Sequence, residues 1–179
     1  MNKATLLGLV AVMTAGTALF TGCGSDETGD GAAAGGCFDY STFNGDEPAT
    51  TFRADVVPIF QTSCAVGGAT CHGDAGNTKP GQHYLGESLP AEMTEDQLAE
   101  VLSANLNKES VKGGSMRVIS PGSPEKSFLM AKMDGLCQAD LACTNGDCGT
   151  IMPQTNTEPL AEDVRNTVRR WIAQGAEDN

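Results

Sequence analysis

The stretch of sequence that decides the fold reads SCAVGGATCHG and runs from Ser63 to Gly73. It contains an adjacent cysteine and histidine, Cys71-His72, and a second cysteine, Cys64, seven positions before Cys71. An adjacent thiol and imidazole are typical of covalent haem attachment, because the thiol adds to a porphyrin vinyl group while the imidazole binds the iron. The usual signature, C-x-x-C-H, has a shorter gap between its cysteines. The stretch therefore predicts a c-type haem site with a lengthened signature.

The longer gap between the two cysteines is compatible with attachment of both. A few additional loop residues add well under ~1 kcal/mol of closure entropy, and Gly67-Gly68 can bulge outward without strain. Two interpretations remain open. Either Cys64 and Cys71 both form thioether bonds, which analogy with the usual motif favours, or Cys71 alone does so and Cys64 forms a disulfide. His72 is the expected proximal iron ligand in both cases.

Met152 is the expected distal iron ligand. An iron that carries electrons needs a second axial ligand, and a thioether sulfur gives a higher reduction potential than a second imidazole. Met152 lies in an expected loop, is followed by Pro153, which restricts the backbone, and precedes the last expected helix. His83 is the rival ligand, but it follows His72 by only eleven residues, on a loop expected to stay on the same side of the haem.

The N-terminal segment predicts export and lipid anchoring. An apolar run, residues 4–20, leads into Phe20-Thr21-Gly22-Cys23, which is typical of a signal peptide, residues 1–22, that ends in a lipoprotein cleavage box. An uncleaved membrane helix would need a longer and more uniformly apolar span. Cys23 is therefore the expected lipid attachment site.

Residues 23–36 are expected to form a flexible acidic and Gly/Ala-rich tether, because their small and acidic side chains cannot bury enough apolar area to offset chain entropy. Gly24, rather than an aspartate, follows the lipid cysteine, which resembles the pattern of bacterial lipoproteins sent to the outer membrane. The expected location is outside the cytoplasm, on the periplasmic side or the cell surface. The lipid is the only expected contact with the membrane.

Residues 37–179 have the size of one domain. The whole chain has 11 Lys and Arg against 23 Asp and Glu, and its net charge of −12 would repel nucleic acid and anionic lipid. A redox partner protein with a basic docking surface is the expected partner, and no nucleic-acid role is expected. The sequence has no Ser-His-Asp set and no phosphate-binding loop, so we expect no enzyme activity.

Hydrophobic periodicity predicts an all-α domain. Asp55 is expected to cap the first helix, with Pro58 in its first turn, while Thr94 and Gln97 form a capping box for the second. Arg169 is expected to lie near the C-terminal end of the last helix, where a cation complements the helix dipole. The expected helices span about 56–63, 94–106, 123–135 and 161–174, and long loops join them.

The apolar core of this domain is expected to be thin, because many positions are taken by Gly, Pro and polar loop residues. Disulfides and a cofactor are both expected to add stability. If the two cysteines of the quoted stretch hold haem, three pairings of the other four are possible, and the sequence does not choose among them. The easiest local closure joins Cys137 to Cys143, which leaves Cys37 for Cys148.

A zinc site is an alternative use of these thiols. Cys64, Cys71, His72, Cys143 and Cys148 could together supply a tetrahedral set of ligands. In an oxidising exported compartment, however, thiols pair more readily with one another. We therefore favour disulfides over zinc.

Several short segments of the chain, taken in order, resemble a known family. They are Val57-Pro58-Ile59-Phe60, Cys71-His72-Gly73, Ser120-Pro121-Gly122-Ser123-Pro124, Ser127-Phe128-Leu129, Cys148-Gly149-Thr150-Ile151-Met152-Pro153 and Trp171-Ile172-Ala173-Gln174-Gly175-Ala176. Together they resemble the c-type cytochrome domains of exported bacterial lipoproteins, including the planctomycete-type cytochrome c family. The resemblance covers about residues 52–176.

The resemblance implies a cytochrome c-like fold of three to four helices around one covalent haem c. It also implies that His72 is the proximal ligand, that Met152 is the distal ligand, and that the protein carries electrons. Relatives of this kind often combine a lengthened gap before Cys-His with a cysteine before the Gly-x-x-Met-Pro segment, here Cys148. This combination implies a disulfide between Cys64 and Cys148, with the haem held by Cys71 alone.

The leading hypothesis is a lipid-anchored monohaem c-type cytochrome that transfers single electrons. A haem-free lipoprotein module is the alternative, in which three disulfides staple the domain and the acidic surface binds a partner. A haem enzyme such as a peroxidase would need an open iron face, which Met152 would close.

Overall fold

The computed structural model describes residues 37–137 and 141–179. The predicted signal peptide, the tether and the lipid attachment site Cys23 lie outside these residues. The described part is helical and contains no β-strand, only isolated bridges between single residues. The expectation of an all-α domain with long loops is confirmed to this extent.

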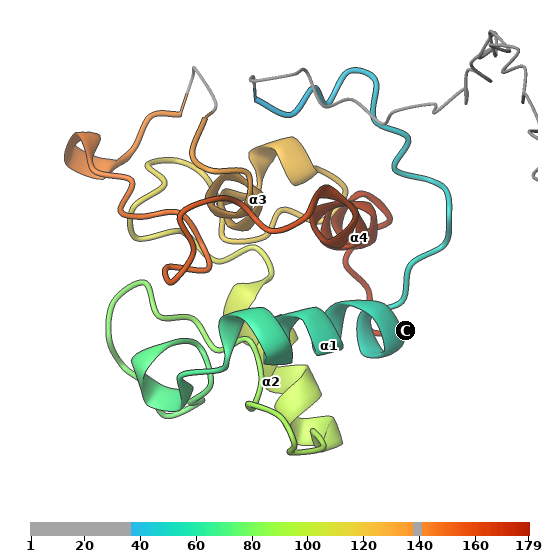
Figure 1. Cartoon of the computed structure of the whole chain (residues 1–179), viewed down its shortest axis with the longest axis vertical. Coiled ribbons are helices and arrows are strands. Elements are labelled where there is room, and N and C mark those ends of the chain that lie inside the picture. Colours follow the sequence, from blue (N-terminus) through green and yellow to red (C-terminus); the bar gives the residue numbers. More distant parts are fainter. Residues whose placement is uncertain (1–36, 138–140) are drawn as a thin grey trace, which may run out of the picture.

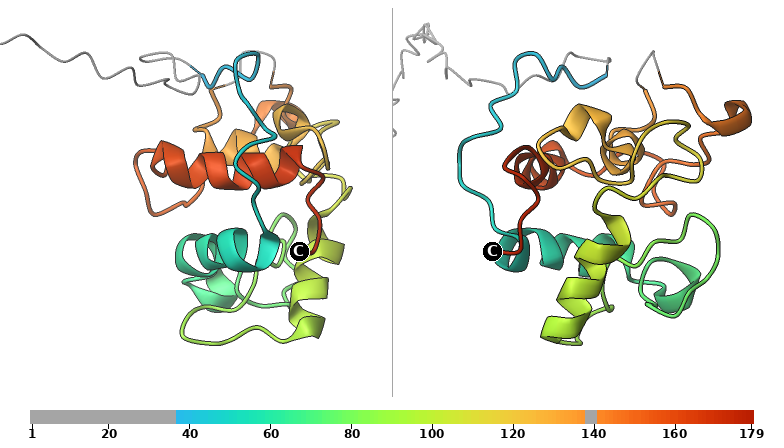
Figure 2. Two further views of the ribbon diagram at one scale, coloured as in Figure 1. Left: turned by 90° about the vertical axis from the view of Figure 1, so that its right-hand side faces the viewer. Right: turned by 180° about the vertical axis from the view of Figure 1, so that it is seen from behind.

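The described helices form two halves that face each other (Figure 1). One half contains the first helical run, described below, together with α2 (Glu95–Asn105). The other half contains α3 (Phe128–Met133) and α4 (Glu162–Ala173). Figure 2 shows the first described residues crossing the outer side of α4 to reach the first half, and the chain ending beside the start of the first helical run.

The first helical run is continuous but unevenly wound. It consists of η1 (Phe52–Val56), α1 (Val57–Ile59) and η2 (Phe60–Cys64), and both η segments have the wide turn of a π-helix. The run begins earlier than predicted, because the Asp55 carboxylate accepts hydrogen bonds from the Thr51 amide at 2.7 Å and the Thr51 hydroxyl at 2.9 Å, not from later residues. Pro58 is in the first turn of α1, but η1 precedes α1 without a break, so Pro58 lies in the middle of the continuous run and not at its start.

Local signals predicted α2 and α4 correctly. In α2, the Gln97 amide donates to Thr94 Oγ1 at 3.3 Å and the Thr94 amide donates to Gln97 Oε1 at 2.9 Å, which is the expected capping box. In α4, the helix ends just before Gly175, whose φ of +108° favours glycine.

The single helix expected over 123–135 is divided into two. A short 3₁₀ turn, η4 (Pro124–Lys126), precedes α3, and Ser127 between them has an extended backbone. The Ser127 hydroxyl donates to the Ser123 carbonyl at 3.0 Å and accepts from the Ser120 amide at 2.9 Å. These bonds satisfy a buried polar side chain and hold the break in place. Two further 3₁₀ turns, η3 (Gly68–Thr70) and η5 (Thr144–Gly146), lie in the loops.

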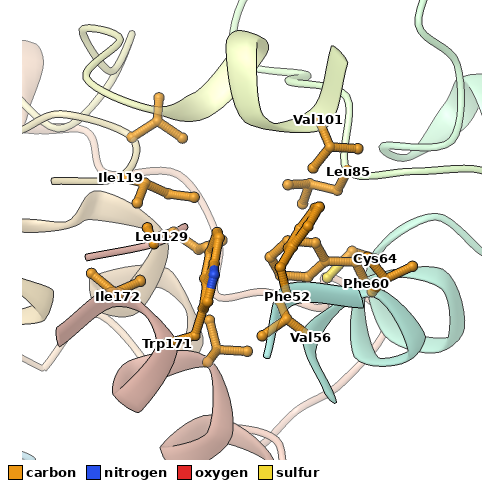
Figure 3. Close-up of a cluster of buried hydrophobic side chains, with 14 of the residues drawn as sticks. Phe52, Val56, Phe60, Cys64, Leu85, Val101, Ile119, Leu129, Trp171 and Ile172 are labelled. Atoms are coloured by element: carbon orange, nitrogen blue, oxygen red, sulfur yellow. The ribbon is translucent and has the colours of Figure 1, made fainter. Parts of the chain in front are cut away.

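Trp171 of α4 joins the two halves of the core (Figure 3). Its side chain is fully buried, stacks on Phe52 with ring centroids 5.2 Å apart, and meets the edge of Phe60 at 6.3 Å. Phe60 lies one helical turn before Cys64. The packing of Trp171 therefore fixes the position of the helix end that carries Cys64.

A buried charged cluster in the other half was not predicted from the sequence. Arg169, expected to complement the helix dipole, is fully buried, and its guanidinium pairs with Asp134 at 2.5 Å. Arg165 pairs with the same carboxylate at 2.6 Å. The ring of Phe38 covers Arg169, with 3.4 Å between the ring centroid and Cζ, and Tyr40 donates its hydroxyl to Asp134 at 3.0 Å. Pairing of this kind offsets the cost of burying a charge.

We expect Trp171→Ala to lower the free energy of unfolding by ~3 to 5 kcal/mol, because it leaves a cavity between Phe52 and Phe60. Urea unfolding followed by circular dichroism measures this change. The matched control is Leu89→Ala, which removes an apolar side chain that is 55% exposed and should cost less than ~1 kcal/mol. Equal losses in the two variants would contradict the role of Trp171 as the joint between the halves.

Candidate functional site

A cavity of about 520 Å³ contains the residues that the sequence predicts to bind haem. Cys64, Cys71, His72, His83 and Met152 all line it, although they come from three separate segments of the chain. The walls belong to both halves of the fold, since the end of the first helical run and α3 both contribute. The cavity is therefore the candidate functional site.

The extra residues between Cys64 and Cys71 fold into a compact turn. The Cys71 amide donates to the Gly68 carbonyl at 3.0 Å, and Gly68 has a φ of +52°. The His72 amide then donates to the Cys64 carbonyl at 3.2 Å. At Gly67, an added Cβ would lie 2.5 Å from Cys71 Sγ, so only glycine allows the thiol to approach the backbone this closely. The lengthened gap thus returns Cys71-His72 to the end of the helix.

The two thiols of this stretch are close enough to influence each other. Cys64 is buried, and burial together with the neighbouring Cys71 raises its pKa to about 12. Its thiol is consequently protonated at neutral pH. Cys71 is half-buried, and both residues keep free thiols.

The His72 ring is held with one nitrogen available. Its Nδ1 is 2.6 Å from the His83 carbonyl oxygen, so Nδ1–H is the donor and Nε2 keeps its lone pair. Burial lowers the pKa of His72, and the ring is therefore neutral at pH 7. The His72 carbonyl also accepts from the Leu85 amide at 2.9 Å. A neutral imidazole oriented through its second nitrogen is the usual state of a metal-ligating histidine.

The rival ligand His83 lines the same cavity but is engaged elsewhere. Its ring is hydrogen-bonded to the backbone of Ala104, and burial lowers its pKa. The backbone carbonyl of His83 is the group that orients His72. His83 therefore already has a clear role as a positioning residue for His72.

The loop that carries Met152 is fastened to α3 through Lys132. The Met152 amide donates to the Lys132 carbonyl at 3.0 Å. The Lys132 ammonium group donates to the Cys148 carbonyl at 2.7 Å and also to the Thr150 carbonyl. Burial, followed by the nearby Lys112, lowers the pKa of Lys132. Lys132 falls within the helix expected over 123–135, and no local signal in the sequence indicates its contact with a loop about twenty residues later.

The cysteine pairing belongs to one of the three pairings that the sequence leaves open, but it differs from the easiest local closure and from the pairing that the resemblance implies. Cys143 and Cys148 form a disulfide with Cα atoms 5.0 Å apart. The predictions of Cys137 with Cys143, Cys37 with Cys148 and Cys64 with Cys148 are all wrong. The turn η5 explains the pairing, because Asn145 takes a φ of +54° and the Gly146 amide bonds to the Cys143 carbonyl at 3.0 Å, which reverses the chain between the two cysteines.

The zinc alternative loses two of its ligands to this disulfide. Within residues 37–137 and 141–179, no group of three or more His, Cys, Asp or Glu side chains is arranged to hold a metal ion. Cys64, Cys71 and His72 line the same cavity but do not form such a group. The structure thus gives the zinc alternative no support.

Comparisons with models of known protein families, with curated proteins and with solved structures each give no match. In the part of the chain that the structure describes, no helix has both the length and the apolar character needed to span a bilayer.

We expect Lys132→Met to loosen the Met152 loop while α3 stays folded. The change removes two hydrogen bonds from a charged donor, and the Met152 amide should then exchange with solvent at least ~10-fold faster in native-state hydrogen exchange. The matched control is Lys112→Met, which removes only the exposed ion pair with Asp147 and should change this rate much less. Equal acceleration in both variants would contradict a specific fastening by Lys132.

Proposed function

We propose that this chain is a monohaem c-type cytochrome that transfers single electrons. The observation that supports this proposal is the meeting of Cys64, Cys71, His72 and Met152 at one cavity. Each of these residues is a candidate haem-binding residue on the basis of the amino-acid sequence alone. Their convergence is expected if they serve one cofactor and would be a coincidence otherwise.

The residues around the cavity fit a haem in three respects. A volume of about 520 Å³ lies within the range of cofactor and ligand pockets, ~300 to 1,000 Å³. Apolar side chains such as Val118, Phe128 and Leu129 form part of the wall, as a porphyrin ring requires. Lys112 and Lys132 also line the cavity and would provide cations near the carboxylates that a haem carries.

Each of these residues has a defined role in the proposal. His72 would bind the iron through Nε2, and the His83 carbonyl would keep the ring oriented and electron-rich. Met152 would supply the second axial ligand, and its thioether would raise the reduction potential. A bound haem supplies reversible one-electron exchange. The protein sets the potential through the ligands, burial and hydrogen bonding.

Attachment through both cysteines is the version that we propose. Thioether formation adds the thiol S–H across the C=C bond of a porphyrin vinyl group. The sulfur bonds to one carbon and the hydrogen to the other, so the reaction needs a free thiol and no oxidant. The disulfide between Cys143 and Cys148 removes the partner that the resemblance assigned to Cys64. Cys64 therefore stays available beside Cys71, with both facing the cavity.

The cellular setting remains part of the proposal. A signal peptide and a lipidated Cys23 would place the domain outside the cytoplasm, at a bacterial membrane, where c-type cytochromes exchange electrons with other proteins. The net charge of −12 favours a redox partner with a basic docking surface. No substrate chemistry is required for this role.

Cleavage of the full chain before aspartate residues tests the proposal directly. The peptide 55–73 contains Cys64, Cys71 and His72 and no other cysteine. After expression in a host that matures c-type cytochromes, we expect this peptide to carry one covalent haem, detected by mass and by visible absorption. A porphyrin-free peptide with an internal disulfide would overturn the proposal and favour the haem-free module.

Replacement of Met152 tests the distal ligand. We expect Met152→Ala to shift the visible spectrum toward high spin, and Met152→His to keep a low-spin spectrum but lower the reduction potential, because imidazole replaces a thioether. Met116→Ala is the control, since Met116 is half-buried but does not line the cavity. An unchanged spectrum in Met152→Ala, together with a changed one in His83→Ala, would transfer the distal role to His83.

A further inference from the structure

The described residues that precede the first helical run form a strap, residues 37–51, which crosses the outer side of α4 (Figure 2). At the start of this strap, the Cys37 thiol donates to the Cys137 carbonyl and also contacts the Cys137 thiol. The Phe38 amide is hydrogen-bonded to the Cys137 thiol. Two cysteines that are 100 residues apart in sequence therefore meet at one point.

Contacts that do not involve cysteine hold the strap in this register. Phe38 stacks over the buried guanidinium of Arg169, and the Tyr40 hydroxyl donates to Asp134 at 3.0 Å. Further along the strap, the Gln174 side-chain amide donates to the carbonyls of Gly45 at 2.9 Å and Pro48 at 3.0 Å. These contacts fix the strap on α4, so Cys37 is presented to Cys137 by the packing of its neighbours.

The other cysteines of the described residues already have a place. Cys143 and Cys148 are bonded to each other, and Cys64 and Cys71 line the cavity. Cys37 and Cys137 are then each other's nearest available thiol, and neither lines the cavity. The six cysteines within residues 37–137 and 141–179 thus divide into three neighbouring pairs, one of which faces the cavity.

We propose that Cys37 and Cys137 form a second disulfide, which fastens the strap over the buried ion pair of Asp134 and Arg169. Formation removes one proton and one electron from each thiol. The two electrons pass to the disulfide of an oxidoreductase protein by exchange, and that disulfide becomes a dithiol. The bond requires an oxidising compartment but no haem, so it is independent of the proposed electron-transfer function.

The disulfide has a consequence for the fold. It links the strap to the chain just after α3 and closes a loop of about one hundred residues, which restricts the unfolded chain strongly. It also keeps Phe38 and Tyr40 over Arg169, so that water does not reach the buried pair. The predicted tether would then meet the folded domain at a covalently fixed point.

Peptide mapping of the full chain, purified after export, tests the pairing. Free thiols are alkylated first, and the unreduced protein is then cut before aspartate residues, which places Cys37, Cys137, Cys143 and Cys148 in the separate peptides 30–38, 134–139, 140–146 and 147–162. We expect 30–38 to be linked to 134–139. Alkylated 30–38 and 134–139, or either one linked to any other peptide, would overturn the proposal.

The same digest separates this inference from the proposed function. Peptide 55–73 reports on haem independently, because it contains both cavity cysteines and none of the four others. A link between 30–38 and 134–139 beside a haem-free 55–73 would support the disulfide and overturn the cytochrome. A haem-bearing peptide 55–73 together with alkylated peptides 30–38 and 134–139 would support the cytochrome and overturn the disulfide.

A double substitution measures what the bond contributes. We expect Cys37→Ala with Cys137→Ala to lower the melting temperature by about 5 °C or more, and to speed hydrogen exchange in residues 38–43, without changing the visible spectrum. Reduction of the wild-type protein breaks the bond between Cys143 and Cys148 as well and should lower the melting temperature further. The double variant Cys143→Ala with Cys148→Ala is the control, because it measures the contribution of that second bond alone. A melting temperature within about 1 °C of wild type would overturn the stabilising role.

Discussion

The hydrogen bond from the His72 amide to the Cys64 carbonyl is the contact on which the proposed site depends. It is 3.2 Å long, and it closes the loop that begins at the end of the first helical run. Without it, the six intervening residues would leave Cys71-His72 free to lie far from Cys64. The turn η3 folds this extra chain outward, so a long gap in sequence becomes a short separation in space. Packing of Phe60 against Trp171 then fixes the helix end itself.

The opposite wall of the cavity is built by different means. The loop around Met152 is largely polar and residues 154–158 are exposed, so it has little apolar surface to pack into the core. Hydrogen bonds from Lys132 hold it instead, and the disulfide between Cys143 and Cys148 closes the turn that precedes it. The strap over α4 is held in a similar way, by Arg169, Asp134 and aromatic rings. Polar and covalent contacts thus complement a small apolar core.

Several elements could be predicted because their signals are local. The capping box of Thr94 and Gln97 and the apolar face of α4 lie within a few residues, so the helices follow from the sequence. The start of the first helical run could not be predicted, because the Asp55 carboxylate can accept bonds from residues on either side. The division of the third helix at Ser127 also depends on bonds from a neighbouring segment, through Ser120.

The sequence alone determined which side chains carry the proposed chemistry, because Cys71-His72 is a chemical feature of two adjacent residues, and it determined the negative charge of the molecule. Only the tertiary structure decided which cysteines are neighbours, and that Arg169 is buried while Lys132 holds a loop. Thiols are chemically alike along a chain and differ only in what surrounds them. That surrounding is set by contacts between segments far apart in sequence, which no local pattern records.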